Sequence, residues 1–146
     1  LAGSFAVLAG AAAIDPALAP EPVILAVVLF LRTPPHFWSL AAALRDDYAA
    51  AGVPMLPVVV GTPRASQATL VHTLVLVALS LVPALAYGLG PIYLAGAAAG
   101  GALFVWRSIQ FALAPGRITA MSNFHASLVQ LTLLLVGAML DRWLLA

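Results

Sequence analysis

Cysteine is absent from the 146-residue sequence, which excludes disulfides, thiolate metal sites and cysteine nucleophiles. Charge is also scarce: 8% of the residues are charged, against roughly 25% in soluble domains. The formal net charge is +1, so charge gives no indication of a nucleic-acid partner, and all six basic residues are arginine. Hydrophobic residues make up 64% of the chain, and the mean hydropathy is +1.10. This composition predicts an integral membrane protein made almost entirely of spanning segments.

Five apolar stretches are separated by polar or Pro/Gly-rich segments, at residues 1–14, 23–44, 68–87, 91–113 and 118–140. The first would extend only ~20 Å as a helix, less than the ~30 Å hydrocarbon core, so we interpret it as the tail of a helix. The sequence therefore predicts an all-α, multi-pass transmembrane bundle of about five helices. We interpret residues 1–146 as one partial domain of a longer protein.

The arginines predict an orientation in the membrane. Four of the six fall on one side of the predicted bundle: Arg45, Arg64, Arg107 and Arg117. Because cytoplasmic loops are enriched in arginine and lysine, this side, with the long 45–67 loop, is predicted to be cytoplasmic. Arg142 falls on the opposite side, and Arg32 falls within a span.

The predicted second span contains a charge and two consecutive prolines. Arg32 lies near its middle, where a charged side chain costs about 3 kcal/mol or more. A functional role is one interpretation of Arg32, and snorkelling or contact with water is the other. Pro34 and Pro35 disfavour helical geometry at the residues before them. Because such a break survives in lipid only beside protein or a wet cavity, we predict a break that borders a cavity.

Residues 36–48 are predicted to continue as a helix after this break. One face of that helix would hold His36, Leu40, Ala43 and Asp47, with Asp46 on the neighbouring stripe. The acidic pair would then lie at the cytoplasmic mouth of the bundle, with His36 deeper. One interpretation is a Mg²⁺ site, since Mg²⁺ binds one or two carboxylates together with substrate phosphates. The other is a solvated helix end.

Three further patterns concern the surroundings of the predicted helices: two indicate packing, and the third indicates a cavity. Small residues at four-residue spacing indicate close helix contact, at Gly96, Ala97, Gly100 and Gly101. His72 and His125 fall within spans, where we expect each to be a buried, hydrogen-bonded packing residue. One side of the last predicted helix is polar and is expected to face a cavity, through Asn123, Ser127 and Gln130.

One continuous run, residues 33–59, reads TPPHFWSLAAALRDDYAAAGVPMLPVV. This run resembles the protoheme IX farnesyltransferases (heme O synthases) of the UbiA superfamily of membrane prenyltransferases almost position by position. Residues 124–141 resemble the last helix of that family. The family fold is a nine-helix bundle, and the resemblance implies that this chain holds about its last five helices.

The resemblance implies that the farnesyl group of farnesyl diphosphate is added to a vinyl group of heme B, giving heme O and diphosphate. In the superfamily, two aspartate-bearing regions bind the diphosphate through Mg²⁺. The second region matches Arg45, Asp46, Asp47 and Tyr48, which implies that the two aspartates are metal-binding catalytic residues and that Arg45 and Tyr48 bind substrate. His36 matches a typical family position and is the third catalytic candidate. The first region is absent from this sequence, so we expect the chain alone to be inactive.

The resemblance also implies a location in the inner (plasma) membrane, with farnesyl diphosphate, heme B, the lipid bilayer and a downstream heme A synthase as partners. Arg32 departs from the family pattern, which usually has Trp or another uncharged residue just before the Thr-Pro-Pro sequence. Arg64 is the only cation near a position where the family carries Thr and a basic residue. Arg32 and Arg64 complete the predicted substrate-binding set.

The sequence also allows other functions. Another UbiA-type prenyltransferase would share the motif and the fold. A non-enzymatic heme-binding protein could use His36, His72 and His125 as axial ligands, although these histidines lack paired spacing at similar depth. A transporter half with a broken helix would show inverted internal symmetry, and the sequence has none.

Overall fold

The computed structural model of the chain describes residues 2–17 and 19–145, and these residues form helices joined by turns, without a β-strand. In chain order the helices are α1 (Ala2–Ile14), α2 (Pro20–Ala43), α3 (Arg45–Ala50), α4 (Leu56–Val60), α5 (Thr62–Ala86), α6 (Pro91–Leu113) and α7 (Arg117–Leu145). Helices α2, α5, α6 and α7 are long and apolar enough to cross a membrane. The prediction of an all-α, multi-pass bundle is therefore confirmed, with four helices of spanning length and the shorter α1.

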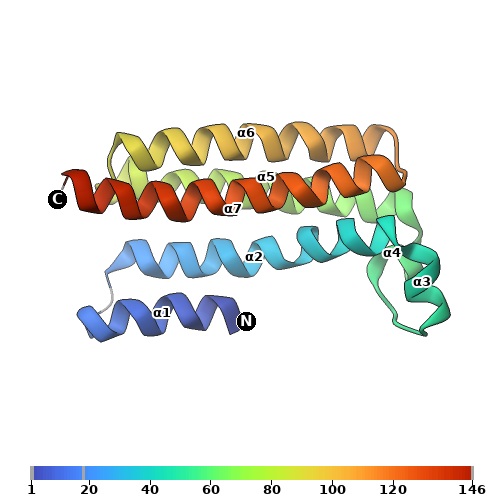
Figure 1. The fold of residues 1–146 in the computed structure, drawn as a ribbon, viewed down its shortest axis with the longest axis horizontal. Coiled ribbons are helices and arrows are strands. Elements are labelled where there is room, and N and C mark those ends of the chain that lie inside the picture. The colour runs from blue at the N-terminus through green and yellow to red at the C-terminus, as the bar shows by residue number, and fades with distance from the viewer. Residues whose placement is uncertain (1, 18, 146) are drawn as a thin grey trace.

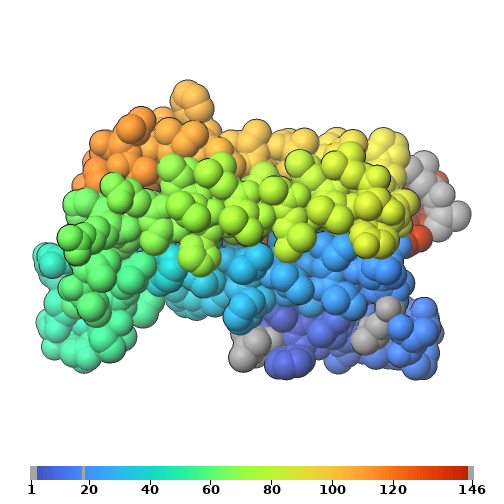
Figure 2. Space-filling view, turned by 180° about the vertical axis from the view of Figure 1, so that it is seen from behind, coloured from blue at the N-terminus to red at the C-terminus, as the bar shows by residue number. Residues whose placement is uncertain are grey.

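The four long helices run antiparallel to their chain neighbours and pack side by side (Figure 1). Helix α2 contacts α5 and α7, and α6 contacts α5 and α7, so the four helices close a bundle. Helix α5 crosses the back of the molecule between α2 and α6 (Figure 2). One end of the bundle carries α3, α4 and the turn before α7, while α1 lies along the first half of α2 (Figure 1).

The predicted break at Pro34 and Pro35 is wrong, because α2 is continuous from Pro20 to Ala43. Each proline removes one backbone N–H donor from the helix. Spanning helices tolerate this loss where neighbouring helices and hydroxyl side chains satisfy the affected backbone. Pro35 is fully buried, and α2 contacts both α5 and α7. Packing against α5 and α7 therefore accommodates the proline pair without interrupting the span.

The helix stops instead at Leu44, ten residues later than Pro34. Leu44 has φ −114° and ψ 34°, outside the helical region, and α3 begins at the next residue. The prediction of one helix from residue 36 to residue 48 is therefore wrong. His36 and Asp47 belong to two different helices, and their spacing in the sequence does not place them on a common face.

Close contact between α6 and α7 depends on glycine, as the small-residue spacing predicted. A Cβ atom on Gly96 would lie 2.7 Å from the Leu133 carbonyl oxygen of α7, and one on Gly100 would lie 3.0 Å from the Gln130 Cα atom. On the other side of α6, a Cβ atom on Gly101 would lie 2.7 Å from a Val77 methyl carbon of α5. These glycines let the three backbones approach one another.

Candidate functional site

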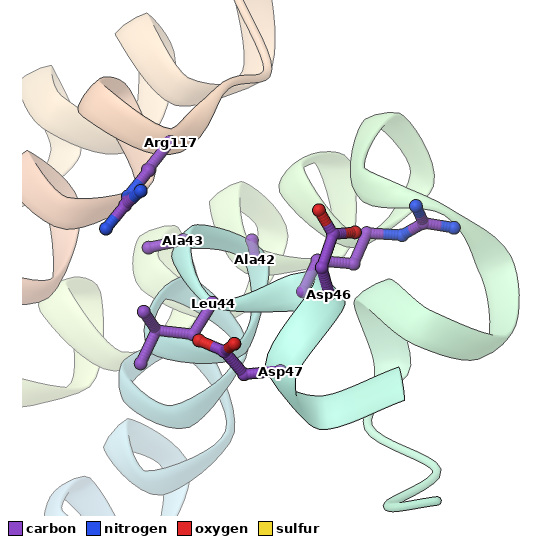
Figure 3. A pocket seen from close by; sticks show the side chains of 7 residues that line it. Ala42, Ala43, Leu44, Asp46, Asp47 and Arg117 are labelled. Atoms are coloured by element: carbon purple, nitrogen blue, oxygen red, sulfur yellow. The ribbon is translucent and has the colours of Figure 1, made fainter. Parts of the chain in front are cut away.

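A pocket of about 340 Å³ opens at the end of the bundle where α2, α3 and α7 meet (Figure 3). It is lined by Ala42, Ala43, Leu44, Arg45, Asp46, Asp47 and Arg117. The turn at Leu44 carries the chain out of α2 and places the first turn of α3 over the mouth of the pocket. We call this site the mouth pocket.

The two carboxylates of the mouth pocket come from adjacent residues in the first turn of α3. Both aspartates are exposed to solvent. The Asp47 carboxylate lies beside the Leu44 side chain, whereas the Asp46 carboxylate points to the opposite side of α3 (Figure 3). Both predicted metal ligands therefore line one pocket and are exposed, but their carboxylates lie on different sides of α3.

Arg117 is the charged residue of the pocket that the sequence analysis did not predict as a site residue. It begins α7, and its side chain faces the region between α7 and the end of α2 (Figure 3). Within the described part of the chain, neither Asp46 nor Asp47 is within ion-pair distance of it. The number of spans could have predicted this position. Two antiparallel spans, α5 and α6, separate α3 from α7, so the chain returns to the same end of the bundle at Arg117.

The other residues predicted to bind substrate near the mouth have different surroundings. The Arg45 Nε atom donates to the Pro57 carbonyl oxygen over 3.2 Å, which ties α3 to α4. Tyr48 is half-buried on α3, and Arg64 is exposed in the first turn of α5. Neither Tyr48 nor Arg64 lines the mouth pocket.

A second polar group lies in the middle of the bundle, where α2 contacts α7. The Arg32 guanidinium donates from Nε and Nη2 to the Ser127 carbonyl oxygen, over 3.0 and 2.8 Å. One turn further along α2, the His36 Nδ1 atom lies 2.6 Å from the Ser127 hydroxyl oxygen. Both predicted residues therefore meet one residue of α7. We call Arg32, His36 and Ser127 the mid-span cluster.

Neighbouring groups orient the His36 ring. It stacks on Phe124 of α7 with centroids 4.5 Å apart, and it meets the edge of Phe37 at 5.3 Å. The Ser127 hydroxyl donates to the Phe124 carbonyl oxygen over 2.7 Å. Because a hydroxyl has one hydrogen, Ser127 then accepts from His36 Nδ1–H, which leaves Nε2 as the proton acceptor.

Buried side chains link all four long helices below the mouth pocket. Asn123 of α7 donates to Ser39 of α2 over 2.8 Å, and Ser108 of α6 donates to Asn123 over 2.8 Å. The Ser108 hydroxyl also lies 3.0 Å from the Thr73 hydroxyl of α5. The polar side of α7 therefore faces neighbouring helices here, not the predicted cavity. Gln130, further along that side, is fully buried, and neither polar atom of its amide has a partner in the described residues.

The remaining two histidines, His72 and His125, differ in their surroundings. His72 is half-buried: its Nδ1 atom lies 3.1 Å from the Ala68 carbonyl oxygen, and its ring meets the edge of Trp38 at 5.0 Å. This agrees with the predicted packing role. His125 is exposed on α7, contrary to the prediction that it is buried. Among the residues that the structure describes, no three His, Asp or Glu side chains are grouped closely enough to hold a metal ion.

Four apolar helices of spanning length, with acidic and basic side chains gathered at one end, define a multi-pass helical membrane protein. The comparison with family models identifies it more closely. Residues 1–134 match the UbiA prenyltransferase family, and the chain belongs to that family.

Several curated relatives carry the same name. The chain is 57% identical to Protoheme IX farnesyltransferase 2 and 48% identical to Protoheme IX farnesyltransferase 1, both from Paramagnetospirillum magneticum (strain ATCC 700264 / AMB-1), over 97% of the chain and 49% and 50% of those proteins. It is 39% identical to Protoheme IX farnesyltransferase from Thioalkalivibrio sulfidiphilus (strain HL-EbGR7), over 98% of the chain and 47% of that protein. The chain thus spans about half the length of these relatives. No solved structure matches it.

Proposed function

We propose that the protein containing this chain transfers the farnesyl group of farnesyl diphosphate to heme B, giving heme O in the biosynthesis of heme A. The observation that carries this proposal is the mouth pocket, in which Asp46, Asp47 and Arg117 gather at one end of an apolar bundle. Membership in the UbiA prenyltransferase family and the names of its relatives support the choice of reaction.

The carboxylates of Asp46 and Asp47 point to opposite sides of α3, so each fits a Mg²⁺ ion that arrives with the diphosphate as a single carboxylate ligand. Both are exposed carboxylates on one pocket, and Mg²⁺ in proteins is commonly held by one or two carboxylates together with substrate phosphates and water. When bound, Mg²⁺ would neutralise charge on the departing diphosphate. We propose that Arg117 assists by binding a phosphate oxygen directly, since arginine forms charge-assisted hydrogen bonds to phosphate.

The helices behind the pocket suit the other half of the reaction. As the bond between the farnesyl C1 carbon and the diphosphate breaks, positive charge develops on an allylic carbon. A membrane-embedded apolar bundle limits early capture of that carbon by water. The vinyl group of heme B then forms the new carbon–carbon bond, and addition of water to the resulting cation releases a proton. His36, with Nε2 as an acceptor, is the proposed acceptor of that proton.

We infer that the mouth pocket faces the cytoplasm from the inner membrane. Arg45, Arg64 and Arg117 all lie at the end of the bundle that carries α3 and α4, and arginine-rich ends are retained inside the cell. Farnesyl diphosphate would then reach the pocket from the cytoplasm. The apolar product would leave into the bilayer, where heme A synthase is the proposed downstream partner.

The test uses a chimera in which residues 1–146 replace the matching segment of the 57% identical relative. Asp47→Asn keeps the shape of the side chain and removes the charge that a hard cation requires. We expect it to lower the rate of heme O formation by roughly 30- to 1,000-fold, equivalent to about 2–4 kcal/mol of transition-state stabilisation. Product is measured with heme B, farnesyl diphosphate and Mg²⁺ in proteoliposomes.

Two further variants define the result. Asp15→Asn makes the same change in an exposed carboxylate at the opposite end of the bundle and should leave the rate unchanged. Arg117→Gln should raise the KM for farnesyl diphosphate more than the KM for heme B. If Asp47→Asn and Asp15→Asn lowered the rate of heme O formation by the same small factor, the acidic pair would be only a solvated helix end. The proposed diphosphate site, and with it the proposed function, would then be wrong.

A further inference from the structure

Arg32 holds a positive charge at the middle of a spanning helix. It lies 12 residues after Pro20 and 11 residues before Ala43, which places it ~16–18 Å from either end of α2. Its exposed fraction is 8%. Charged side chains at this depth are costly, and those that occur usually pair with another group or mark a ligand pathway.

Within residues 2–17 and 19–145, no acidic side chain forms an ion pair with Arg32. All five acidic residues of the chain lie near the ends of the bundle: Asp15, Glu21, Asp46, Asp47 and Asp141. Glu21 forms an ion pair with Arg142, in which Glu21 Oε1 lies 3.3 Å from Arg142 Nη2. In the described part of the chain, the Arg32 guanidinium donates hydrogen bonds to one group, the neutral carbonyl of Ser127, through Nε and Nη2. Among residues 2–17 and 19–145, Nη1 has no hydrogen-bond acceptor, so part of the guanidinium fork remains available to an anion.

We propose that Arg32 binds a carboxylate carried by an apolar molecule, and that this carboxylate is a propionate of the porphyrin acceptor. This inference rests on the proposed function, which supplies the acceptor. Porphyrins of the protoheme type carry two propionates, which need a cationic partner inside the membrane. A planar guanidinium fork matches a carboxylate in geometry as well as in charge.

Depth in the bundle distinguishes this carboxylate from the diphosphate. The mouth pocket adjoins the end of α2 at Ala43, ~16 Å along the helix from Arg32. A diphosphate held at Asp46 and Asp47 spans only two phosphorus atoms and does not reach Arg32. In protoheme the two propionates lie together on one edge of the macrocycle, and each vinyl group lies on the pyrrole ring opposite one of them. A ring with a vinyl group near the mouth therefore directs its propionates toward the middle of the bundle.

Ser127 fixes the position of the proposed carboxylate site. Its carbonyl oxygen holds the Arg32 guanidinium, and its hydroxyl holds the His36 ring one turn nearer the mouth. Arg32 is therefore anchored by two hydrogen bonds before any ligand arrives. An anchored guanidinium loses less side-chain freedom when the carboxylate binds.

The test measures binding of metal-free protoporphyrin IX and its dimethyl ester to the chimera in lipid nanodiscs, by porphyrin fluorescence. The metal-free ring removes iron ligation by histidine, and the diester keeps the apolar body without the charges. We expect the unmodified chimera to bind the diacid about 10- to 100-fold more tightly than the diester. Arg32→Gln should abolish this preference by weakening diacid binding alone, and Arg32→Lys should restore part of it.

Arg107→Gln is the matched control, because Arg107 lies on α6 and donates to the Gln110 side chain over 2.9 Å. It should leave the preference for the diacid unchanged. If Arg32→Gln weakened diacid and diester binding equally, Arg32 would act only through the structure of the bundle, and the proposal would be overturned. Unchanged diester affinity also shows that the Arg32→Gln variant is folded.

A separate arm distinguishes the two possible anions. If Arg32→Gln weakened competition by inorganic diphosphate and left the diacid preference intact, the anion at Arg32 would be the diphosphate, and the carboxylate assignment would be wrong. The proposed function is scored independently, by heme O formation in the unmodified chimera. Heme O formation without an Arg32-dependent preference overturns this inference alone, whereas the preference without heme O formation overturns the proposed function alone.

Discussion

Asp141 illustrates how one side chain of α7 fixes the beginning of α6. It is 4% exposed, and its carboxylate accepts hydrogen bonds from the backbone N–H groups of Gly90, Ile92 and Tyr93, over 2.5, 3.2 and 3.3 Å. The first N–H groups of a helix have no partner within the helix, and they carry a partial positive charge. A carboxylate from a distant part of the chain therefore replaces the usual local cap.

At this scale we predict that Asp141→Asn lowers the free energy of unfolding by about 1–2 kcal/mol, because the cap loses its charge while keeping its shape. The measurement is equilibrium unfolding in mixed micelles, followed by circular dichroism. Asp15→Asn is the control, since the exposed Asp15 carboxylate accepts one N–H, that of Ala17, at 3.0 Å. Equal changes in the two variants would mean that Asp141 does not cap α6.

At the scale of elements, α7 meets its two neighbours through different kinds of residue. Helix α6 approaches α7 through Gly96 and Gly100, whereas α2 meets α7 through the polar side chains of Arg32 and His36. Small residues bring two backbones into van der Waals contact, and hydrogen-bonded side chains need more room. Arg32 and His36, the polar residues proposed to act in the middle of the bundle, therefore both lie where α2 meets α7.

We predict that Gly96→Ala destabilises the bundle by about 1–2 kcal/mol, despite the higher helix propensity of alanine. Its Cβ atom would lie 2.7 Å from the Leu133 carbonyl oxygen, which is backbone and cannot rotate away. Gly10→Ala is the matched control, because no atom lies within 4 Å of a Cβ at Gly10. That control should be stabilised by about 0.5–1 kcal/mol. Unfolding of the two variants by the same method would show opposite signs, and a stabilised Gly96→Ala variant would contradict the close approach.

At the scale of the whole molecule, the four long helices give the bundle two chemically different ends. One end carries α3, α4 and Arg117, and the other carries Asp15, Glu21 and Asp141 (Figure 1). The single ion pair within the described residues, Arg142–Glu21, belongs to the second end. This asymmetry is the basis for the proposed orientation in the membrane.

Single-cysteine labelling tests that orientation cleanly, since the chain has no cysteine of its own. Ala51 follows α3, Ala17 precedes α2, and both are exposed. In intact right-side-out vesicles, an impermeant thiol reagent should label Ala17→Cys and should label Ala51→Cys only after permeabilisation. Labelling of Ala51→Cys alone in intact vesicles would reverse the topology and place the mouth pocket outside the cell.

Much of the architecture followed from the sequence, because spanning segments are set by length and hydropathy alone. Residues 91–113 were predicted as one helix and form α6 with the same bounds. The predicted stretch 68–87 corresponds to α5, which begins earlier, at Thr62, because a proline in the first turn starts a helix even where the sequence is polar. The cytoplasmic position of loop 45–67 remains a prediction.

The sequence by itself determined which residues carry charge in an otherwise apolar chain, since each such residue stands out against its surroundings: Arg32, Asp46, Asp47 and Arg117. Only the tertiary structure decided which of them act together. The turn at Leu44 separated His36 from Asp47, and antiparallel packing brought Arg117 to the acidic pair and Ser127 to Arg32. Local spacing specifies the faces of a single helix, whereas the grouping of residues 70 to 95 positions apart depends on how whole helices pack.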